Sequence, residues 1–103
     1  MEDPRLSHQT LIVLRVFLDQ SQHVGLAGSD IAKLTNLLPG TIYPLMARLE
    51  RSGWLSSEWE KLDPRKAGRP RKRLYRLTGV GYNKAREALS QLTVSSKEGQ
   101  WTF

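Results

Sequence analysis

The stretch that decides the fold is Pro-Gly-Thr-Ile-Tyr-Pro-Leu-Met-Ala-Arg-Leu-Glu-Arg-Ser-Gly-Trp, residues 39–54. Its apolar residues recur at i, i+3, i+4 and i+7, the spacing of one helix face; they are Ile42, Leu45, Met46 and Leu49. The opposite face is short or basic: Pro44, Ala47, Arg48 and Arg51, with Thr41 and Tyr43 towards its edges. We predict a helix that begins between residues 39 and 41 and ends at Gly53. Its basic face is suited to approach by another molecule.

Size and composition limit the possible classes of protein. A chain of 103 residues forms one domain with one small core. It has no run of about 18 apolar residues that could cross a membrane. The first residues do not resemble a secretory signal. There is no cysteine for a disulfide or a thiolate metal site. We therefore expect a cytoplasmic protein without a membrane span.

The charge is concentrated in one segment. The net charge is +6, and residues 65–76 contain no acid but many of the basic residues: Arg65, Lys66, Arg69, Arg71, Lys72, Arg73 and Arg76. Such a run is either a solvated loop or a surface for a polyanion.

Residues 8–20 are predicted to form the first helix, with Ser7 as its N-cap. A surface helix usually buries one apolar face, but this helix has nearly two. One stripe is Leu11, Leu14 and Leu18, and the other is Val13, Val16 and Phe17. We expect one stripe to pack on the core and the other on a partner subunit. The alternative is a helix at the centre of the fold.

A second, shorter helix is predicted after a loop at residues 21–28. Gly28 or Ser29 is its expected N-cap, and Asp30 in the first turn suits the helix dipole. Ile31 and Leu34, with Leu37 or Leu38, are expected to point inward. A turn at residues 36–40 then leads into the helix of residues 39–54. Two short helices joined in this way form a helix-turn-helix pattern.

The pattern changes to alternation after Gly53. Residues 54–60 and 73–78 are predicted as two strands. They are joined by residues 61–72, a long loop rich in proline, glycine and charge, whereas ordinary hairpin loops have about 2–5 residues. A helix-turn-helix followed by such a hairpin is a winged helix.

A final helix is predicted at residues 79–92, with Thr78 as its N-cap. Its apolar face is Tyr82, Ala85, Ala88, Leu89 and Leu92, and two glycines, Gly79 and Gly81, weaken its first turn. The remaining tail ends in Trp101 and Phe103, which either dock on the body or a partner or belong to a loose tail.

The predicted fold class is α+β, mainly α: a winged helix-turn-helix with three helices, a two-stranded wing and a C-terminal helix. Residues 1–92 are expected to form this winged-helix domain. Residues 93–103 form the tail.

Catalytic chemistry has little support. His8 and His23 have no second ligand at zinc spacing, and no nucleophile motif or phosphate-binding glycine loop is present. Glu58 and Glu60 share a strand face, but we interpret them as ordinary strand residues. We expect no enzyme activity, no cofactor and no metal.

Two features together predict binding to double-stranded DNA. Arg48 and Arg51 can pair with phosphate or guanine, while Thr41 and Tyr43 can contact the sugar-phosphate backbone of DNA. In residues 68–71, Gly-Arg-Pro-Arg, an extended wing tip could place its arginines in a narrow minor groove. The candidate DNA-binding residues are Ser29, Gly40, Thr41, Tyr43, Pro44, Arg48, Arg51, Lys66, Arg69, Pro70, Arg71 and Lys72.

Several blocks resemble the PadR family of bacterial transcriptional regulators. They are Gly-Thr-Ile-Tyr-Pro at 40–44, Arg-Leu-Glu at 48–50, Gly-Trp-Leu at 53–55, Gly-Arg-Pro at 68–70 and Tyr-Arg-Leu-Thr at 75–78. The resemblance implies a repressor that dimerises through its first and last helices and binds an inverted-repeat operator. It places Thr41, Tyr43, Pro44 and Arg48 on the recognition helix, and residues 69–72 on the wing. The candidate dimerisation residues are Leu11, Leu14, Leu18, Ala85, Leu89 and Leu92.

The chain departs from the family pattern at two points. Ser29 stands where many members have a large aromatic residue, and only one helix follows the wing, as in the short members of the family. Two other functions stay open: a winged helix that acts as a protein-interaction adaptor, and a regulator with an effector pocket at the dimer interface, lined by Trp101 or the first helix.

Overall fold

The computed structural model describes residues 3–20 and 25–95, the side chains of 92–95 excepted. The elements are α1 (His8–Asp19), β1 (Leu26–Ala27), α2 (Gly28–Thr35), α3 (Pro39–Arg51), β2 (Leu55–Trp59), α4 (Pro64–Ala67), β3 (Arg73–Leu77) and α5 (Gly79–Ser95). The strands form one antiparallel sheet in the order β1-β3-β2. The chain has the predicted winged helix-turn-helix fold.

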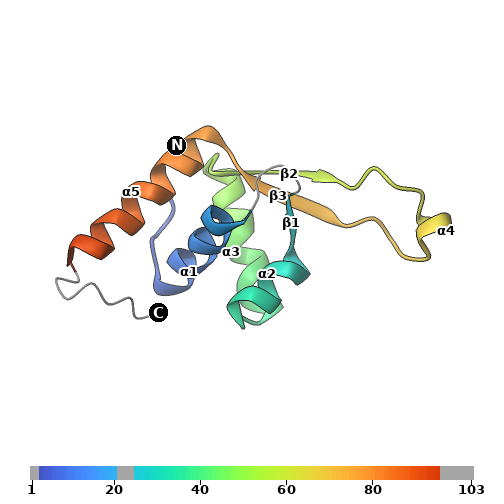
Figure 1. The fold of residues 1–103 in the computed structure, drawn as a ribbon, viewed down its shortest axis with the longest axis horizontal. Helices are drawn as coiled ribbons and strands as arrows, with labels where there is room; N and C mark the ends of the chain where they lie inside the picture. Colours follow the sequence, from blue (N-terminus) through green and yellow to red (C-terminus); the bar gives the residue numbers. More distant parts are fainter. Residues whose placement is uncertain (1–2, 21–24, 96–103) are drawn as a thin grey trace.

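The elements separate into a body and two extensions (Figure 1). Helices α1, α2 and α3 gather beside the base of the sheet, whereas β2 and β3 continue outward as the wing, with α4 at its tip. Helix α5 extends in the opposite direction. The wing is therefore displayed away from the body.

The predicted inner stripe of α3 forms the centre of the core. Ile42, Leu45, Met46 and Leu49 are each at most 2% exposed. They pack in one cluster with side chains from α1, α2, the sheet and α5: Val13, Leu14, Phe17, Ile31, Trp54, Leu55, Tyr75 and Ala85. Because removing apolar area from water is the main favourable term in folding, this cluster sets the orientation of α3.

Local signals fix several helix ends as predicted. Ser7 caps α1 by accepting a hydrogen bond from the Thr10 N–H (3.2 Å). Gly53, at φ 79°, follows the end of α3, and the Trp54 N–H then bonds the Leu49 carbonyl (2.9 Å), the closure typical of a C′ glycine. Thr78 accepts from the Gly81 N–H (3.0 Å) and donates to the Gly53 carbonyl (2.6 Å). Thr78 thus joins the end of α3 to the start of α5.

The details of α2 differ from the prediction. The N-cap is Ala27 rather than Gly28 or Ser29, and the Asp30 carboxylate accepts from the Ala27 N–H (2.9 Å). Leu34 is 52% exposed, so the prediction that it points inward is wrong. Of the two alternatives Leu37 and Leu38, Leu37 packs against the core and Leu38 is 74% exposed. At about 100° per residue, the inward face of α2 is centred between Ile31 and Ala32, and Leu34 lies well to one side.

Two short elements occupy segments that were predicted to be loops. Residues 26–27 form β1, where Leu26 pairs with Tyr75 and Ala27 with Leu74. Residues 64–67 form α4, whose N-cap Asp63 accepts from the Arg65 N–H (3.0 Å). Neither segment is long enough to show a periodic pattern, so both depend on contacts made by the folded chain. The wing strands themselves end within one residue or so of their predicted bounds.

Helix α5 continues to Ser95, past its predicted end at residue 92. Gly81 lies so close to the turn after α3 that a Cβ there would collide with the Trp54 carbonyl group, whereas Gly79 faces open space. Tyr82 remains 40% exposed, with the Arg86 guanidinium 5.7 Å from its ring centroid. The predictions for His23, Trp101 and Phe103 lie outside the described residues.

Candidate nucleic-acid interface

The outer face of α3 is exposed and basic. Arg48 and Arg51 are exposed, and neither forms an ion pair within residues 3–20 and 25–91. Gly40, Pro44 and Ala47 are exposed beside them, and Thr41 is half-buried. Burial of the opposite stripe leaves this face as the one that α3 can present to a partner.

Tyr43 connects the start of α3 to the start of α2. Its side chain is 50% exposed, and a Cβ at Gly28 would lie 2.5 Å from its Cε1 and Oη atoms. Ser29, the next residue, is exposed at the N-terminus of α2, where backbone N–H groups and the helix dipole favour an anion. The structure therefore brings Ser29 and Tyr43 together, although they are distant in sequence.

A cleft of about 350 Å³ separates this corner from the base of the wing. It is lined by Ala27, Gly28, Ser29, Tyr43, Trp59, Arg71, Lys72, Arg73 and Tyr75. Burial raises the pKa of the Tyr75 phenol on its inner side. The cleft unites predicted site residues from α2, α3 and the wing on one surface.

Sequence reasoning missed Trp59 and Arg73. The two residues are cross-strand partners, Trp59 is 57% exposed, and the Arg73 guanidinium lies 5.5 Å from its ring centroid, within the range of a cation–π contact. The available sequence signal was a tryptophan near the end of a predicted strand.

A polar network joins the wing to α3. Ser57 on β2 donates to the Glu50 carboxylate of α3 (2.5 Å), and Arg73 Nε on β3 donates to Ser57 Oγ (2.9 Å). Arg73 also lies 3.7 Å from Glu50 Oε2. These contacts fix the base of the wing relative to α3.

The wing tip is closed by Glu60. Its Oε1 accepts from Arg69 Nη1 (2.7 Å) and from the Lys72 N–H (2.8 Å), and its Oε2 accepts from Arg69 Nη2 (3.1 Å). The Arg69 hydrogen bonds, followed by the Lys72 N–H, lower the pKa of Glu60 from 4.5 to about 2. Arg71 Nε donates to the Leu62 carbonyl (2.9 Å).

This geometry corrects the prediction of an extended tip. Gly68 is left-handed, at φ 69°, and the Arg69 side chain folds back onto Glu60. Arg73 and Arg76 likewise lie near acids, Glu50 and Glu58. The charged groups of the basic run without an ion-pair partner among the described residues are those of Arg65, Lys66, Arg71 and Lys72. Arg65 was not among the predicted site residues.

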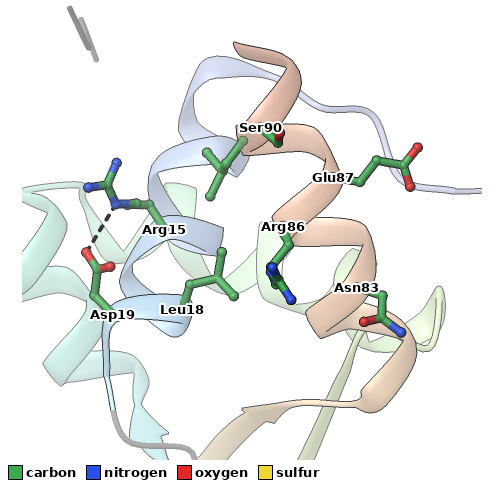
Figure 2. Close-up of a pocket in the computed structure, with 8 residues that line it drawn as sticks. Arg15, Leu18, Asp19, Asn83, Arg86, Glu87 and Ser90 are labelled. Carbon is green, nitrogen blue, oxygen red and sulfur yellow. Dashed lines mark hydrogen bonds and ion pairs between the residues drawn. The ribbon is translucent and has the colours of Figure 1, made fainter. Parts of the chain in front are cut away.

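The predicted dimerisation residues are distributed between core and surface. Leu14 and Ala85 have no exposed area, Leu89 is 6% exposed, and Leu11 and Leu18 are half-buried; the side chain of Leu92 lies outside the described residues. Leu18 and Leu89 line a shallow groove of about 520 Å³ between α1 and α5. Figure 2 shows its charged rim, where Arg15 pairs with Asp19 (3.2 Å) and Arg86 and Glu87 project from α5.

The described residues contain no cluster of histidine, cysteine and acidic side chains that could hold a metal ion. None of the helices in this part of the chain is long and apolar enough to cross a membrane.

A winged helix-turn-helix with a basic helix face beside a basic wing is the architecture of a DNA-binding regulator. The chain belongs to the PadR-like family of transcriptional regulators, because the family model described as "Transcriptional regulator PadR-like family" matches residues 17–87. No curated protein matches the chain in sequence.

Solved structures share the fold. A PadR family transcriptional regulator from Eggerthella lenta is 29% identical, with a TM-score of 0.67 over 87% of this chain and 79% of that one. A mutant of MepR from Staphylococcus aureus is 22% identical, with a TM-score of 0.70 over 90% of this chain; the chain spans 62% of its length. MepR solved in complex with DNA is 23% identical, with a TM-score of 0.67 over 88% of this chain and 67% of that one.

Proposed function

We propose that this protein is a sequence-specific DNA-binding repressor that binds an inverted-repeat operator as a homodimer. The observation that carries the proposal is the single surface formed by Ser29, Tyr43 and the wing beside the exposed arginines of α3. Family membership and the fold shared with MepR, which has been solved with DNA, support it. In this proposal residues 1–92 form the DNA-binding and dimerisation domain, which acts in the bacterial cytoplasm.

The parts of the surface have different roles. Helix α3 lies in the major groove, because its exposed face is narrow at Ala47 and lets the backbone approach the base edges. Arg48 and Arg51 contact guanine or phosphate. The N-terminus of α2, with Ser29 and Tyr43, holds one phosphate, and the wing contacts the neighbouring backbone.

The surface chemistry favours DNA over a protein-interaction adaptor. An adaptor would need an apolar patch on the outer face of α3, since interface cores are depleted in charge. That face instead exposes two arginines without ion-pair partners in the described chain. Unpaired surface arginines attract phosphate and release its counterions.

Dimerisation uses the groove between α1 and α5. The groove carries charges of both signs, Arg15 and Arg86 with Asp19 and Glu87, around the apolar Leu18 and Leu89. Such a surface can be self-complementary across a two-fold axis, as an isologous interface requires. The buried Leu14 and Ala85 support the groove from within.

Selection of bound sequences from random DNA tests the proposal. We expect a palindrome with half-sites about one helical turn apart, and steep loss of affinity with salt. Arg48→Ala and Arg51→Ala should each reduce the salt slope by about one unit. Arg5→Ala, in the N-terminal segment that runs beside α5, is the matched control for charge. A native protein that enriches no sequence would overturn the proposal, and a reporter gene behind the selected operator distinguishes repression from activation.

A further inference from the structure

Glu60 holds the ends of the wing tip together. Its backbone N–H bonds the Lys72 carbonyl (2.9 Å), so these two residues form the last rung of the hairpin before the tip. The Glu60 carboxylate forms a bidentate ion pair with the Arg69 guanidinium and accepts a hydrogen bond from the Lys72 N–H. Paired guanidinium and carboxylate groups in this fork geometry are among the strongest and most directional polar contacts in proteins.

The segment closed by these contacts contains α4. Its first turn is capped by Asp63, and its two basic residues, Arg65 and Lys66, are exposed. A helix of four residues does not form by itself, because helix nucleation is unfavourable. The contacts of Glu60 with Arg69 and Lys72 are a tertiary constraint on the ends of the segment that contains α4.

Simple electrostatics gives a different expectation for Glu60. A carboxylate on a wing that approaches DNA should repel phosphate, so removing it should strengthen binding. Pairing with Arg69 cancels one charge of each sign, which leaves Arg65 and Lys66 as the basic groups of α4 beyond the closure. Simple repulsion predicts that replacing Glu60 strengthens DNA binding, whereas a role in holding the wing tip predicts that it weakens DNA binding.

We propose that Glu60 is a positioning residue of the DNA interface, that Arg69 is its structural partner rather than a DNA-reading residue, and that Arg65 and Lys66 on α4 bind phosphate at the wing tip. This inference rests on the proposed function for its DNA component. The sequence pattern had instead indicated that Glu60 is an ordinary strand residue and that Arg69 binds DNA.

Glu58 provides the matched control. It lies on β2, two residues before Glu60, and pairs with Arg76 Nη1 (2.8 Å) on β3, but it closes no loop. Glu60→Gln and Glu58→Gln each remove one negative charge from the wing. We expect Glu60→Gln to weaken operator binding about three- to tenfold, since each factor of ten in affinity corresponds to about 1.4 kcal/mol. Glu58→Gln should leave affinity unchanged or raise it.

A double-mutant cycle separates positioning from direct contact. Arg69→Gln should weaken binding in the native background and have little further effect once Glu60 is glutamine or alanine. Lys66→Ala should weaken binding in the native background and lose most of its effect in Glu60→Ala. If Arg69→Gln costs the same in both backgrounds, Arg69 contacts DNA directly and the inference is overturned.

A measurement without DNA tests the structural component. Steady-state ¹⁵N–¹H NOE values for residues 61–68 should fall in Glu60→Gln and Glu60→Ala, but not in Glu58→Gln. Because the tip is remote from the core, the thermal midpoint should be unchanged in all three variants. Unchanged NOE values in Glu60→Ala, or stronger binding by Glu60→Gln, overturn the positioning role alone. Failure of the native protein to bind DNA overturns the proposed function, and the NOE comparison still decides whether Glu60 orders the tip.

Discussion

The ring of Tyr43 lies against the α-carbon of Gly28, in the space where a side chain at position 28 would begin. A Cβ there would be 2.5 Å from Cε1 and Oη of the tyrosine and 2.6 Å from its Cζ. The contact joins the first turns of α2 and α3 and orients the phenol beside Ser29. In this protein the glycine is needed for close approach of a side chain rather than for an unusual backbone angle.

Gly28→Ala should therefore move the Tyr43 ring while leaving the fold intact, because the colliding atoms are the far end of a rotatable side chain. We expect operator affinity to fall about three- to tenfold, with little change in the thermal midpoint. Fluorescence anisotropy with the selected operator measures the first quantity and circular dichroism the second. In a Tyr43→Ala background Gly28→Ala should have almost no additional effect on affinity; an equal loss in both backgrounds would contradict this explanation.

The two glycines at the start of α5 should respond in opposite ways to alanine. Gly81→Ala forces a methyl group into the Trp54 backbone carbonyl and should lower the free energy of unfolding by about 1–3 kcal/mol. Gly79→Ala meets open space and should be neutral or stabilising by up to about 1 kcal/mol. Urea denaturation of both variants measures the difference. Equal effects would show that helix propensity, not the contact with Trp54, governs this turn.

The Glu60–Arg69 pair should persist in acid. The pKa of Glu60 is lowered in the folded protein from 4.5 to about 2, so the pair contributes fully above the unfolded pKa. Its contribution is lost as the pH falls from 4.5 through about 2. Titration of the Glu60 carboxyl carbon by NMR should show a group that is still ionised just below its unfolded pKa. A midpoint near 4.5 would mean that the pair is open in solution.

Substitution in the α1–α5 groove should separate the subunits. Leu18→Arg places a third cation beside Arg15 and Arg86, so we expect the molar mass from light scattering to fall from two chains to one at low micromolar concentration. Operator affinity should fall with it, because half-sites are then bound independently. Leu34→Arg, at a residue 52% exposed on α2, is the control for adding the same charge to an exposed leucine. A native protein that already elutes as one chain would refute the proposed dimer.

Much of the fold follows from short-range signals. The period of Ile42, Leu45, Met46 and Leu49 predicted the buried face of α3, because a helix repeats its faces within a few residues. Ser7, Gly53 and Thr78 were predicted as caps for the same reason: a cap acts on backbone groups two to four residues away. The exposed basic side of α3 follows directly from burial of the other side.

The candidate site was predicted only in part. Tyr43, Arg48 and Lys72 were predicted from a helix face and the basic run, and Ser29 from the family pattern. The structure brings Ser29, Tyr43 and Lys72 to one cleft. Trp59 and Arg73 were missed because their roles depend on the register of β2 against β3. Leu34 was misplaced because two apolar residues three apart do not determine the direction of a helix of eight residues.

The sequence by itself determined the order of the longer helices and the two wing strands, the inner face of α3 and the presence of a strongly basic wing. These properties are local, since they depend on periodicity, caps and charge within a few residues. Only the tertiary structure decided which cations of the wing are held in ion pairs and which are free to contact a partner. Glu60 reaches Arg69 nine positions away and the Lys72 N–H twelve positions away, across a hairpin whose register is a property of the folded sheet. Because Arg69 pairs with Glu60, this predicted DNA-binding residue instead stabilises the wing tip, and Arg65 and Lys66 remain exposed there.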